Sequence, residues 1–362
     1  MVRAKAQRDG GTVKAVVYHG PADFRFESVA DAALRDPSDV VVRVSRTAIC
    51  GSDLHLWHGG VPVLEQGFAV GHEFVGVVED AGAAVRTVRR GDRVLVSCTT
   101  GCGTCAPCRD GLHSACPVTT AGGAQNVFGF SSALPGGQAE AVRVPFADTN
   151  CFRIPASVDD EHALFLTDIL PTGYLGAELA EVGAGDVVVV LGCGPVGAFA
   201  QRASQLRGAA RVLAVDPDTG RLARAAARGC ETIDPAQDDV AARVLAATGG
   251  RGADAVIEAV GRPELLQQAL LLARAGGRIA VIGLCAAPVE IQPILLFLKN
   301  LTLRSGLVNP QRFVPRLLAA IEAGRLDPTE IITHRLALAD AARGYELFAR
   351  HEDGALKVVL AP

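Results

Sequence analysis

The sequence predicts an α/β protein of two domains, in which an irregular β domain is joined to a doubly wound parallel sheet. Three observations carry this prediction. The chain has 362 residues, a length that suits two domains of ordinary size. Its first part holds short β-branched segments separated by Gly and Pro. Its second part alternates apolar strands with helical segments.

Residues 12–155 predict a mostly antiparallel β domain whose loops are suited to hold metals. The expected strands are Val40–Val44, Glu73–Val78, Arg93–Val96 and Ala139–Val144. The character of the sequence changes near Asp159, where residues 160–181 predict two helical pieces broken at Pro171–Thr172.

The second domain begins with Asp186–Leu191, a continuous apolar run typical of a parallel strand buried on both faces. Helices and strands then alternate as helix Val196–Arg207, strand Arg211–Val215, helix Thr219–Arg228, strand Glu231–Ile233, helix Ala236–Ala247, strand Ala253–Ala259, helix Pro263–Ala275, strand Arg278–Ile282 and strand Leu301–Leu307. Helix Arg312–Ala323 and strand Ala355–Leu360 look like a return to the first domain. We therefore expect a first domain of residues 1–170 completed by 310–362, and a second domain of residues 171–309.

Charge and composition exclude several classes of partner. The net charge is -4, the pI is near 6.1, and Lys and Arg are scattered, so we expect no nucleic acid or anionic membrane as a partner. No apolar run reaches the roughly 18 residues that span a bilayer. Residues Met1–Gly11 are polar and lack the apolar stretch of a signal peptide, so we expect a cytoplasmic protein with a disordered tail.

A glycine-rich segment predicts a dinucleotide site. Gly192-Cys193-Gly194-Pro195-Val196-Gly197 fits G-x-G-x-x-G, follows an apolar strand directly and opens a helix. The first Gly makes the tight turn, the second lets the backbone approach a pyrophosphate, and the third allows close helix–strand packing. The helix N-terminus, beginning at Pro195 and Val196, supplies partial positive charge. The second domain is therefore expected to be a Rossmann domain.

Asp216 ends the next strand, at the distance where an acid meets the ribose hydroxyls of the cofactor. Its carboxylate would repel a 2′-phosphate, so the sequence favours NAD over NADP. Arg221 lies one helical turn further on and is expected to stack against the adenine. The alternative for Asp216 is a plain helix N-cap before Pro217.

Ten cysteines predict metal binding, because five of them fall between Cys98 and Cys116. Cys102, Cys105, Cys108 and Cys116 have the spacing C-x₂-C-x₂-C-x₇-C, with Gly103 and Gly111 easing the turns. Four thiolates in a compact loop suit a closed, structural zinc site. An iron–sulfur cluster would have three residues before its final Cys, not seven, and a disulfide is disfavoured in a reducing compartment. Cys98 is left over and is expected to be a buried thiol.

A second group of metal-binding residue types is dispersed along the chain. Cys50 begins Cys50-Gly51-Ser52-Asp53-Leu54-His55, and Gly71-His72-Glu73 follows some twenty residues later. Asp168 lies in Thr167-Asp168-Ile169-Leu170-Pro171-Thr172-Gly173-Tyr174, just before the Rossmann strand. Taken singly, a buried Cys or His is more often structural, and Asp168 alone would be a helix N-cap.

Together these segments resemble the medium-chain dehydrogenase/reductase superfamily, in its zinc-dependent alcohol dehydrogenase branch. The resemblance runs from about Thr12 to the C-terminus and rests on CGSDLH, GHE, the four-Cys loop, DILPTGY, GCGPVG and the closing LKVVL. Within this branch the chain resembles the bacterial formaldehyde-dehydrogenase-like subgroup. The resemblance implies a GroES-like catalytic domain, two zinc ions per chain, and NAD as the cofactor.

The resemblance also implies residue roles. Cys50 and His72 would bind a catalytic zinc, with Asp168 as third ligand, leaving one position for substrate. Glu73 would be the neighbouring carboxylate that ligates transiently in some members, and Thr172 would lie against the nicotinamide. Asp in place of Cys as third ligand should make the zinc slightly more Lewis acidic.

A proton relay follows from the same resemblance. Ser52 would accept the proton of the alcohol and pass it along the cofactor ribose, and His55 would deliver it to solvent. Relatives pair through the last Rossmann strand, which predicts a homodimer or a homotetramer.

The expected reaction is hydride transfer between a small alcohol and NAD to give an aldehyde or ketone. A dehydrogenase for polyols or aldehyde hydrates is an alternative, as is a non-catalytic NAD-binding protein. A zinc-finger nucleic-acid binder is disfavoured by the charge and by the lack of a basic recognition helix.

Overall fold

The computed structural model describes residues 11–60, 65–121 and 126–362. These cluster into two compact units, the first made of residues up to 167 with 334–352 and 357–362, the second of residues 168–333 and 353–356. Residues 1–10, which hold most of the tail predicted to be disordered, lie outside the described residues. The predicted α/β class, with an irregular β domain and a doubly wound parallel sheet, is confirmed.

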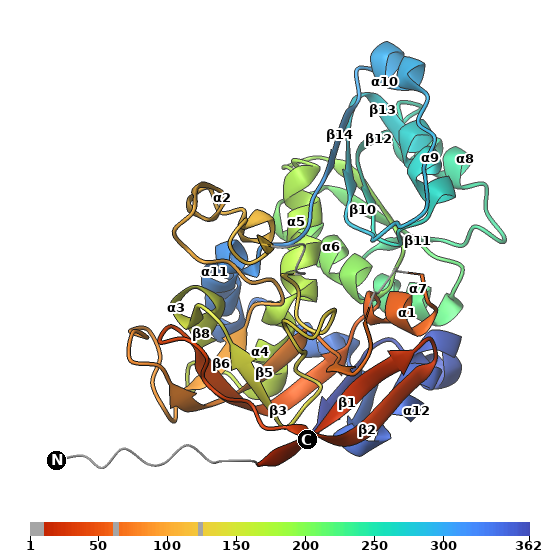
Figure 1. The fold of residues 1–362 in the computed structure, drawn as a ribbon. Helices are drawn as coiled ribbons and strands as arrows, with labels where there is room; N and C mark the ends of the chain where they lie inside the picture. Colours follow the sequence, from red (N-terminus) through yellow and green to blue (C-terminus); the bar gives the residue numbers. More distant parts are fainter. Residues whose placement is uncertain (1–10, 61–64, 122–125) are drawn as a thin grey trace. The chain divides into compact units, whose positions relative to one another are not determined.

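The first unit is built around a seven-stranded sheet and a three-stranded sheet (Figure 1). The larger sheet has the order β15-β16-β3-β5-β6-β8, with β7 also paired to β3, and the smaller has the order β2-β1-β4. Neighbouring strands in the described parts of these two sheets are antiparallel, except that β15 and β16 are parallel. The strands are β1 (Thr12–Gly20), β2 (Asp23–Ala30), β3 (Val40–Ile49), β4 (Phe68–Ala69), β5 (Glu73–Ala81), β6 (Arg93–Val96), β7 (Ala141–Val144), β8 (Cys151–Arg153), β15 (His334–Ala337) and β16 (Val358–Ala361).

Strand β3, which pairs with β5, β7 and β16, contributes buried residues to more than one apolar cluster, with Val41 in a smaller one. Val40, Val42 and Val44 point into one apolar core, which also holds Phe74 and Phe128. The helices of this unit are short, except for the last: α1 (Asp53–Trp57), α2 (Ala106–Arg109), α3 (Ala147–Asn150), α4 (Asp160–Leu164) and α12 (Ala341–Arg350), with 3₁₀ turns at His113–Ala115, Phe165–Thr167 and Leu338–Asp340.

The second unit is a six-stranded parallel sheet in the order β11-β10-β9-β12-β13-β14. Its strands are β9 (Val187–Leu191), β10 (Arg211–Val215), β11 (Glu231–Ile233), β12 (Ala253–Glu258), β13 (Ala273–Val281) and β14 (Thr302–Ser305). Its helices are α5 (Ile169–Leu179), α6 (Pro195–Leu206), α7 (Thr219–Ala227), α8 (Val240–Ala247), α9 (Pro263–Leu272), α10 (Pro293–Lys299) and α11 (Pro310–Glu322), followed by a 3₁₀ turn at Pro328–Ile331.

Strand β9 shows why this sheet is covered on both faces. Val188 and Val190 enter one core, together with residues of α5, α6 and α7. Val187, Val189 and Leu191 enter the opposite core, together with residues of α8 and α9. All five residues of β9 are buried, as the continuous apolar run predicted.

The helical break predicted at Pro171–Thr172 is wrong. The chain breaks earlier, at Asp168, whose φ of -151° and ψ of -76° are not helical. Pro171 lies in the first turn of α5, where a backbone N–H has no intrahelical partner, so a proline is tolerated there. The break therefore sets Asp168 apart from both helical pieces.

The compact units differ from the predicted domains at residues 168–170 and 353–356 and, over a longer stretch, at 310–333. Residues 310–333 cluster with the second unit, in which α11 packs against α5, whereas α12, β15 and β16 belong to the first unit. Arg312 and Arg316 on α11 form ion pairs with Glu178 on α5. The domain boundaries at 170 and 310 remain predictions.

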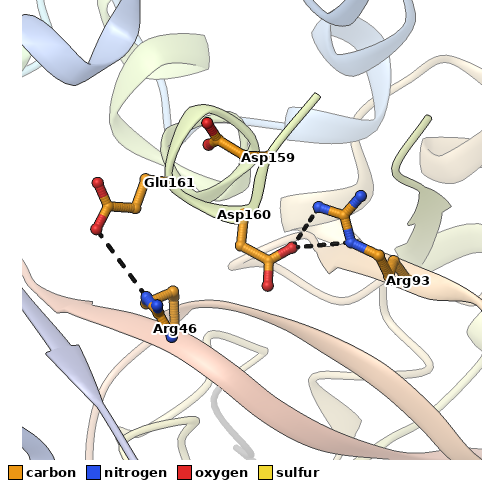
Figure 2. Close-up of a pocket in the computed structure, with 5 residues that line it drawn as sticks. All are labelled: Arg46, Arg93, Asp159, Asp160 and Glu161. Atoms are coloured by element: carbon orange, nitrogen blue, oxygen red, sulfur yellow. Dashed lines mark hydrogen bonds and ion pairs between the residues drawn. The ribbon is translucent and has the colours of Figure 1, made fainter. Parts of the chain in front are cut away.

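Ion pairs fix α4 against the sheet of the first unit, around a charged hollow of about 390 Å³ (Figure 2). The Arg93 guanidinium donates to the Asp160 carboxylate at 2.5 Å, and the Ser45 hydroxyl donates to the same carboxylate. Arg46 lies 4.0 Å from Glu161. Asp159, which also lines the hollow, pairs with His162 on α4. Every charged residue of the hollow thus has a partner, so we assign the hollow a structural role: it anchors the segment that leads into Asp168.

Candidate metal centres and dinucleotide site

The structure brings the four cysteines of the predicted structural site together. Cys102, Cys105, Cys108 and Cys116 offer sulfur atoms that all lie within 4.8 Å of one another. The Sγ atoms of Cys105 and Cys116 are 3.7 Å apart, close to the roughly 3.8 Å expected in a tetrahedron with Zn–S bonds of about 2.3 Å. Gly103 and Gly111 have φ of +76° and +79°, the left-handed conformation that the turns of this loop require.

The electrostatics of this loop fit a divalent cation. Burial and the neighbouring Cys105 thiol raise the pKa of Cys108 to about 12. Burial also raises the pKa of Cys116, but N–H and hydroxyl donors from Cys102 and Thr119 outweigh it and bring that pKa to about 6. Four clustered thiols cannot all ionise without a cation, and a bound divalent metal such as zinc would supply that charge. Among the described residues no cysteine forms a disulfide, and Cys98 is a buried thiol as predicted.

A second cluster contains the predicted catalytic ligands. Cys50, His72, Glu73 and Asp168 each offer one ligand atom, and these atoms all lie within 4.8 Å of one another. All four residues are buried. A thiolate, an imidazole and a carboxylate are donor types that suit zinc, and three of them leave a fourth position for a substrate.

The strand register brings three of these residues together. Strands β3 and β5 are antiparallel, and Ala48 pairs with Glu73. Cys50 follows the end of β3 directly, and His72 precedes the start of β5, so the two segments meet at one edge of the sheet. Asp168 follows Thr167, whose carbonyl oxygen accepts a hydrogen bond from the Cys98 N–H at 2.9 Å.

Asp168 does not act as a helix cap through its side chain. It occupies the N-cap position of α5, but its carboxylate accepts no capping hydrogen bond from the helix backbone. Its Oδ1 lies 3.0 Å from the hydroxyl of Thr172, which also lies 2.9 Å from the Asp168 carbonyl oxygen. Thr172, predicted to lie against nicotinamide, therefore also orients the Asp168 carboxylate.

Asp53 is a site residue to which the sequence reasoning assigned no role. Its carboxylate is fully buried, its Oδ1 lies 3.1 Å from His72 Nδ1, and its Oδ2 accepts the Cys50 N–H at 3.0 Å. A carboxylate at Nδ1 holds the ring proton there, so Nε2 is the nitrogen that would bind a metal. The sequence feature that indicated this role is in the CGSDLH segment, where Asp53 lies three residues after the proposed ligand Cys50.

Ser52 and His55 lie near this cluster on the segment around α1. The Ser52 hydroxyl donates to Cys50 Sγ at 3.3 Å and lies 3.2 Å from His72 Nε2. His55 is half-buried on α1, and its burial, with nearby His58 adding, lowers its pKa. His55 is therefore mostly neutral at pH 7 and able to accept a proton.

Glu73 lies on the side of the cluster next to a buried lysine. The Lys357 ammonium is 2.8 Å from Glu73 Oε1 and 2.7 Å from Oε2, and both side chains are fully buried. Lys357 was not singled out from the sequence. The signal was one cationic residue in the otherwise apolar segment Ala355–Leu360, since lysine is almost never fully buried unless it is paired.

The glycines of the dinucleotide segment have the geometry that a pyrophosphate requires. Gly192 has a φ of +97°, and a Cβ at Gly197 would come within 2.0 Å of the Gly192 carbonyl oxygen. A Cβ at Gly194 would meet no atom within 4 Å, so the backbone there borders open space. Pro195 and Val196 begin α6, whose N-terminus faces this turn. The segment therefore fits a bound dinucleotide.

Asp216 stands at the carboxyl end of β10, as predicted. Its Oδ2 accepts the Cys193 N–H at 2.7 Å and its Oδ1 accepts the Asp218 N–H at 2.9 Å. The N-cap of α7 is Asp218, which excludes the alternative that Asp216 is a plain cap. Arg221 lies 4.0 Å from the Asp216 carboxylate.

Comparison with known proteins finds similarity over nearly the whole chain. The model for the alcohol dehydrogenase GroES-like domain matches residues 36–156, and the model for zinc-binding dehydrogenases matches residues 195–323. The chain is 40% identical over 351 residues to the Mycobacterium tuberculosis protein named "Probable zinc-binding alcohol dehydrogenase Rv1895", covering 97% of this chain and 89% of that one. It is also similar to the solved structure of alcohol dehydrogenase TADH from Thermus sp. ATN1, with 40% identity, a TM-score of 0.89 and coverage of 96% and 99%.

Two further solved structures contain nicotinamide cofactors. A zinc-binding dehydrogenase from Sinorhizobium meliloti 1021, bound to NADP, has 29% identity, a TM-score of 0.83 and coverage of 97% and 100%. An alcohol dehydrogenase from Escherichia coli CFT073, complexed with NADH, has 26% identity, a TM-score of 0.85 and coverage of 98% and 100%. The similar structures thus include both forms of the cofactor.

Proposed function

This chain belongs to the zinc-type alcohol dehydrogenase family, and we propose that it transfers hydride from an alcohol to NAD at a zinc held by Cys50, His72 and Asp168. Members of this family are oxidoreductases that act on alcohols and use zinc and a nicotinamide cofactor. The observation that carries the proposal is the buried thiolate–imidazole–carboxylate cluster. Cys102, Cys105, Cys108 and Cys116 hold a second zinc with a structural role.

Bound zinc supplies a Lewis acid that lowers the pKa of an alcohol hydroxyl, and bound NAD supplies the hydride acceptor. Asp53 fixes the His72 ring by its contact with Nδ1, and Thr172 orients the Asp168 carboxylate. Burial of all the ligand groups excludes water and strengthens their electrostatic interactions.

Ser52 is the residue that takes the proton of the alcohol. Its hydroxyl lies 3.3 Å from Cys50 Sγ and 3.2 Å from His72 Nε2, so it borders the proposed metal position. His55, three residues further along and half-buried, receives the proton and releases it to solvent.

Gly192, Gly194 and Gly197 hold the pyrophosphate of the cofactor, and Asp216 binds the ribose. The Asp216 carboxylate disfavours a 2′-phosphate by charge repulsion, which supports NAD over NADP. Stacking of Arg221 on the adenine remains a prediction.

The test is nicotinamide reduction with NAD and with NADP, measured with primary, secondary and polyol substrates and with formaldehyde, before and after zinc removal. Activity with NAD that disappears on zinc removal and returns on re-addition is the expected result. A rate that survives removal of both zincs would contradict the proposal. The substrate panel also tests the resemblance to the formaldehyde-dehydrogenase-like subgroup, which stays a prediction.

We also propose that two copies of the chain pair through β14. This strand ends the six-stranded sheet, and unpaired backbone groups at a sheet edge are a template for another strand. On the preceding α10, Ile294, Phe297 and Leu298 are exposed, which supports a buried contact there. Sedimentation should show a dimer or tetramer, and Phe297→Asp should shift it toward monomer; a monomeric wild type would refute the pairing.

We also propose that the protein is located in the cytoplasm. Within the described parts of the chain, no helix is long and apolar enough to cross a membrane. Five of the seven proposed zinc ligands are cysteine thiolates, which a reducing compartment preserves. Cell fractionation checks this location, and recovery in an exported fraction would contradict it.

A further inference from the structure

Lys357 is a fully buried cation that the proposed mechanism leaves without a role. It directly precedes β16, and its side chain is 0% exposed. Its ammonium donates to the Ile49 carbonyl oxygen at 2.8 Å and contacts both oxygens of the Glu73 carboxylate at 2.8 and 2.7 Å. The ring of Phe165 lies 5.8 Å away. A buried lysine needs such partners because an unpaired cation is costly there.

The two partners belong to the two segments that supply metal ligands. Ile49 is the last residue of β3 and immediately precedes Cys50, whereas Glu73 is the first residue of β5 and immediately follows His72. One ammonium therefore ties together the strand ends that carry the thiolate and the imidazole.

Glu73 belongs to the ligand cluster and at the same time contacts this ammonium. One of its carboxylate oxygens is within 4.8 Å of the ligand atoms of Cys50, His72 and Asp168. A cation bound by those three residues would attract the Glu73 carboxylate and the Lys357 ammonium would hold it back. If Glu73 became a fourth protein ligand, the position that a substrate needs would be filled.

We propose that Lys357 is a positioning residue that keeps the Glu73 carboxylate on its ammonium and so keeps the substrate position of the metal open. The inference rests on the proposed metal site. Without the lysine charge, the buried carboxylate would lose the cation that contacts both of its oxygens, and the metal would become the strongest partner within reach.

The test uses the full-length protein with cobalt(II) in place of zinc at the catalytic site, because cobalt reports its coordination by visible absorption. Imidazole is the probe, since it is neutral and competes for an open metal position. Wild type, Lys357→Met, Lys357→Arg, Glu73→Gln and the double variant Lys357→Met/Glu73→Gln are compared. Lys299→Met is the matched control, because its ammonium also donates to backbone carbonyls, those of Leu270 and Leu271, within the second unit.

In wild type, Glu73→Gln, Lys357→Arg and Lys299→Met, imidazole should shift the cobalt spectrum at similar concentrations. In Lys357→Met the spectrum without imidazole should already differ, and the affinity for imidazole should fall about tenfold or more. The double variant should recover imidazole binding, because it has no carboxylate to fill the position. A purely structural lysine would not produce this recovery.

Lys357→Met that binds imidazole like wild type, or a double variant that does not recover, would overturn the inference. If Lys357→Met does not fold, Lys357→Gln takes its place, because it also removes the charge but keeps a donor for the Ile49 carbonyl oxygen, and the same loss and recovery of imidazole binding are expected. A wild-type protein that takes up no cobalt at Cys50 and His72 would instead refute the proposed metal site.

Discussion

The two proposed metal sites are built in opposite ways. The four cysteines of the first lie within 15 consecutive positions, Cys102 to Cys116, and the donors that tune them are largely local backbone N–H groups. The ligands of the second come from three distant segments, at Cys50, His72 and Asp168. Around them stand buried charged residues, Asp53, Glu73 and Lys357.

This difference corresponds to the roles that we propose for the two sites, one structural and one catalytic. Four thiolates satisfy zinc completely and leave no position for substrate, so a local loop is sufficient. A site that must bind, release and deprotonate a substrate needs an open position and neighbouring groups that keep it open. Such groups have to be brought in from other parts of the fold, as Lys357 is from the C-terminal segment.

The largest effect on activity is expected from removing a ligand of the dispersed site, the one formed by Cys50, His72 and Asp168. His72→Ala removes a ligand, and loss of several kcal/mol of Lewis-acid stabilisation should lower kcat/KM by about 10³-fold or more. Metal analysis should show one zinc fewer per chain, with the four-Cys zinc retained. Cys98→Ala, which changes a buried thiol outside both clusters, should keep the activity and both zincs; equal loss in the two variants would contradict the assignment.

Removing a ligand of the four-Cys site should lower the stability of the protein more than its activity. Cys105→Ala leaves three thiols without a full ligand set, and we expect a loss of about 3–5 kcal/mol, or about 10 °C in Tm. Activity per folded molecule, measured at low temperature, should change much less than in His72→Ala. A Tm like that of wild type would show that this loop holds no structural metal.

Asp53→Asn tests the role of the carboxylate that contacts His72 Nδ1. The amide keeps the size of the side chain but loses the charge that holds the ring proton on Nδ1, so zinc affinity at the catalytic site should fall about 10–100-fold. Competition with a chelator measures this, and the affinity of the four-Cys site in the same sample is the internal control. Equal weakening of both sites would indicate a general loss of structure.

The smallest effect is expected for Asp168→Cys. The charge of the ligand is kept and a hard oxygen is replaced by a softer thiolate, so the Lewis acidity should decrease slightly. We expect zinc to be retained, kcat to change within about tenfold, and the pH profile of turnover to shift to higher pH. A variant that keeps zinc with an unchanged pH profile would refute the role of Asp168 in tuning the metal.

The sequence predicts periodic and local features well. The strands Arg211–Val215 and Glu231–Ile233 have the predicted bounds, because apolar runs flanked by turns are local signals. The four-Cys loop is equally local, and the structure brings its sulfurs together. By contrast, α10 was missed, because its apolar residues Ile294, Phe297 and Leu298 are exposed and lack the pattern of a helix packed on a core.

The dispersed site was predicted through resemblance rather than from spacing. Cys50 and His72 are 22 positions apart, and only the pairing of Ala48 with Glu73 shows that they meet. Lys357 lies 284 positions from Glu73, and no local pattern predicts that contact. The helical break was misplaced at Pro171 because proline was read as a breaker, although the first turn of a helix accepts it.

The central claim is that one site is closed by four thiolates and the other keeps a position open for substrate. Anomalous diffraction at the zinc edge, from crystals of the zinc-loaded protein, tests it most directly. We predict two zinc peaks per chain, one bound by Cys102, Cys105, Cys108 and Cys116, and one bound by Cys50, His72 and Asp168 with Glu73 remaining on Lys357. A peak in the four-Cys loop alone, or a second zinc closed by Glu73 as a fourth protein ligand, would contradict the account.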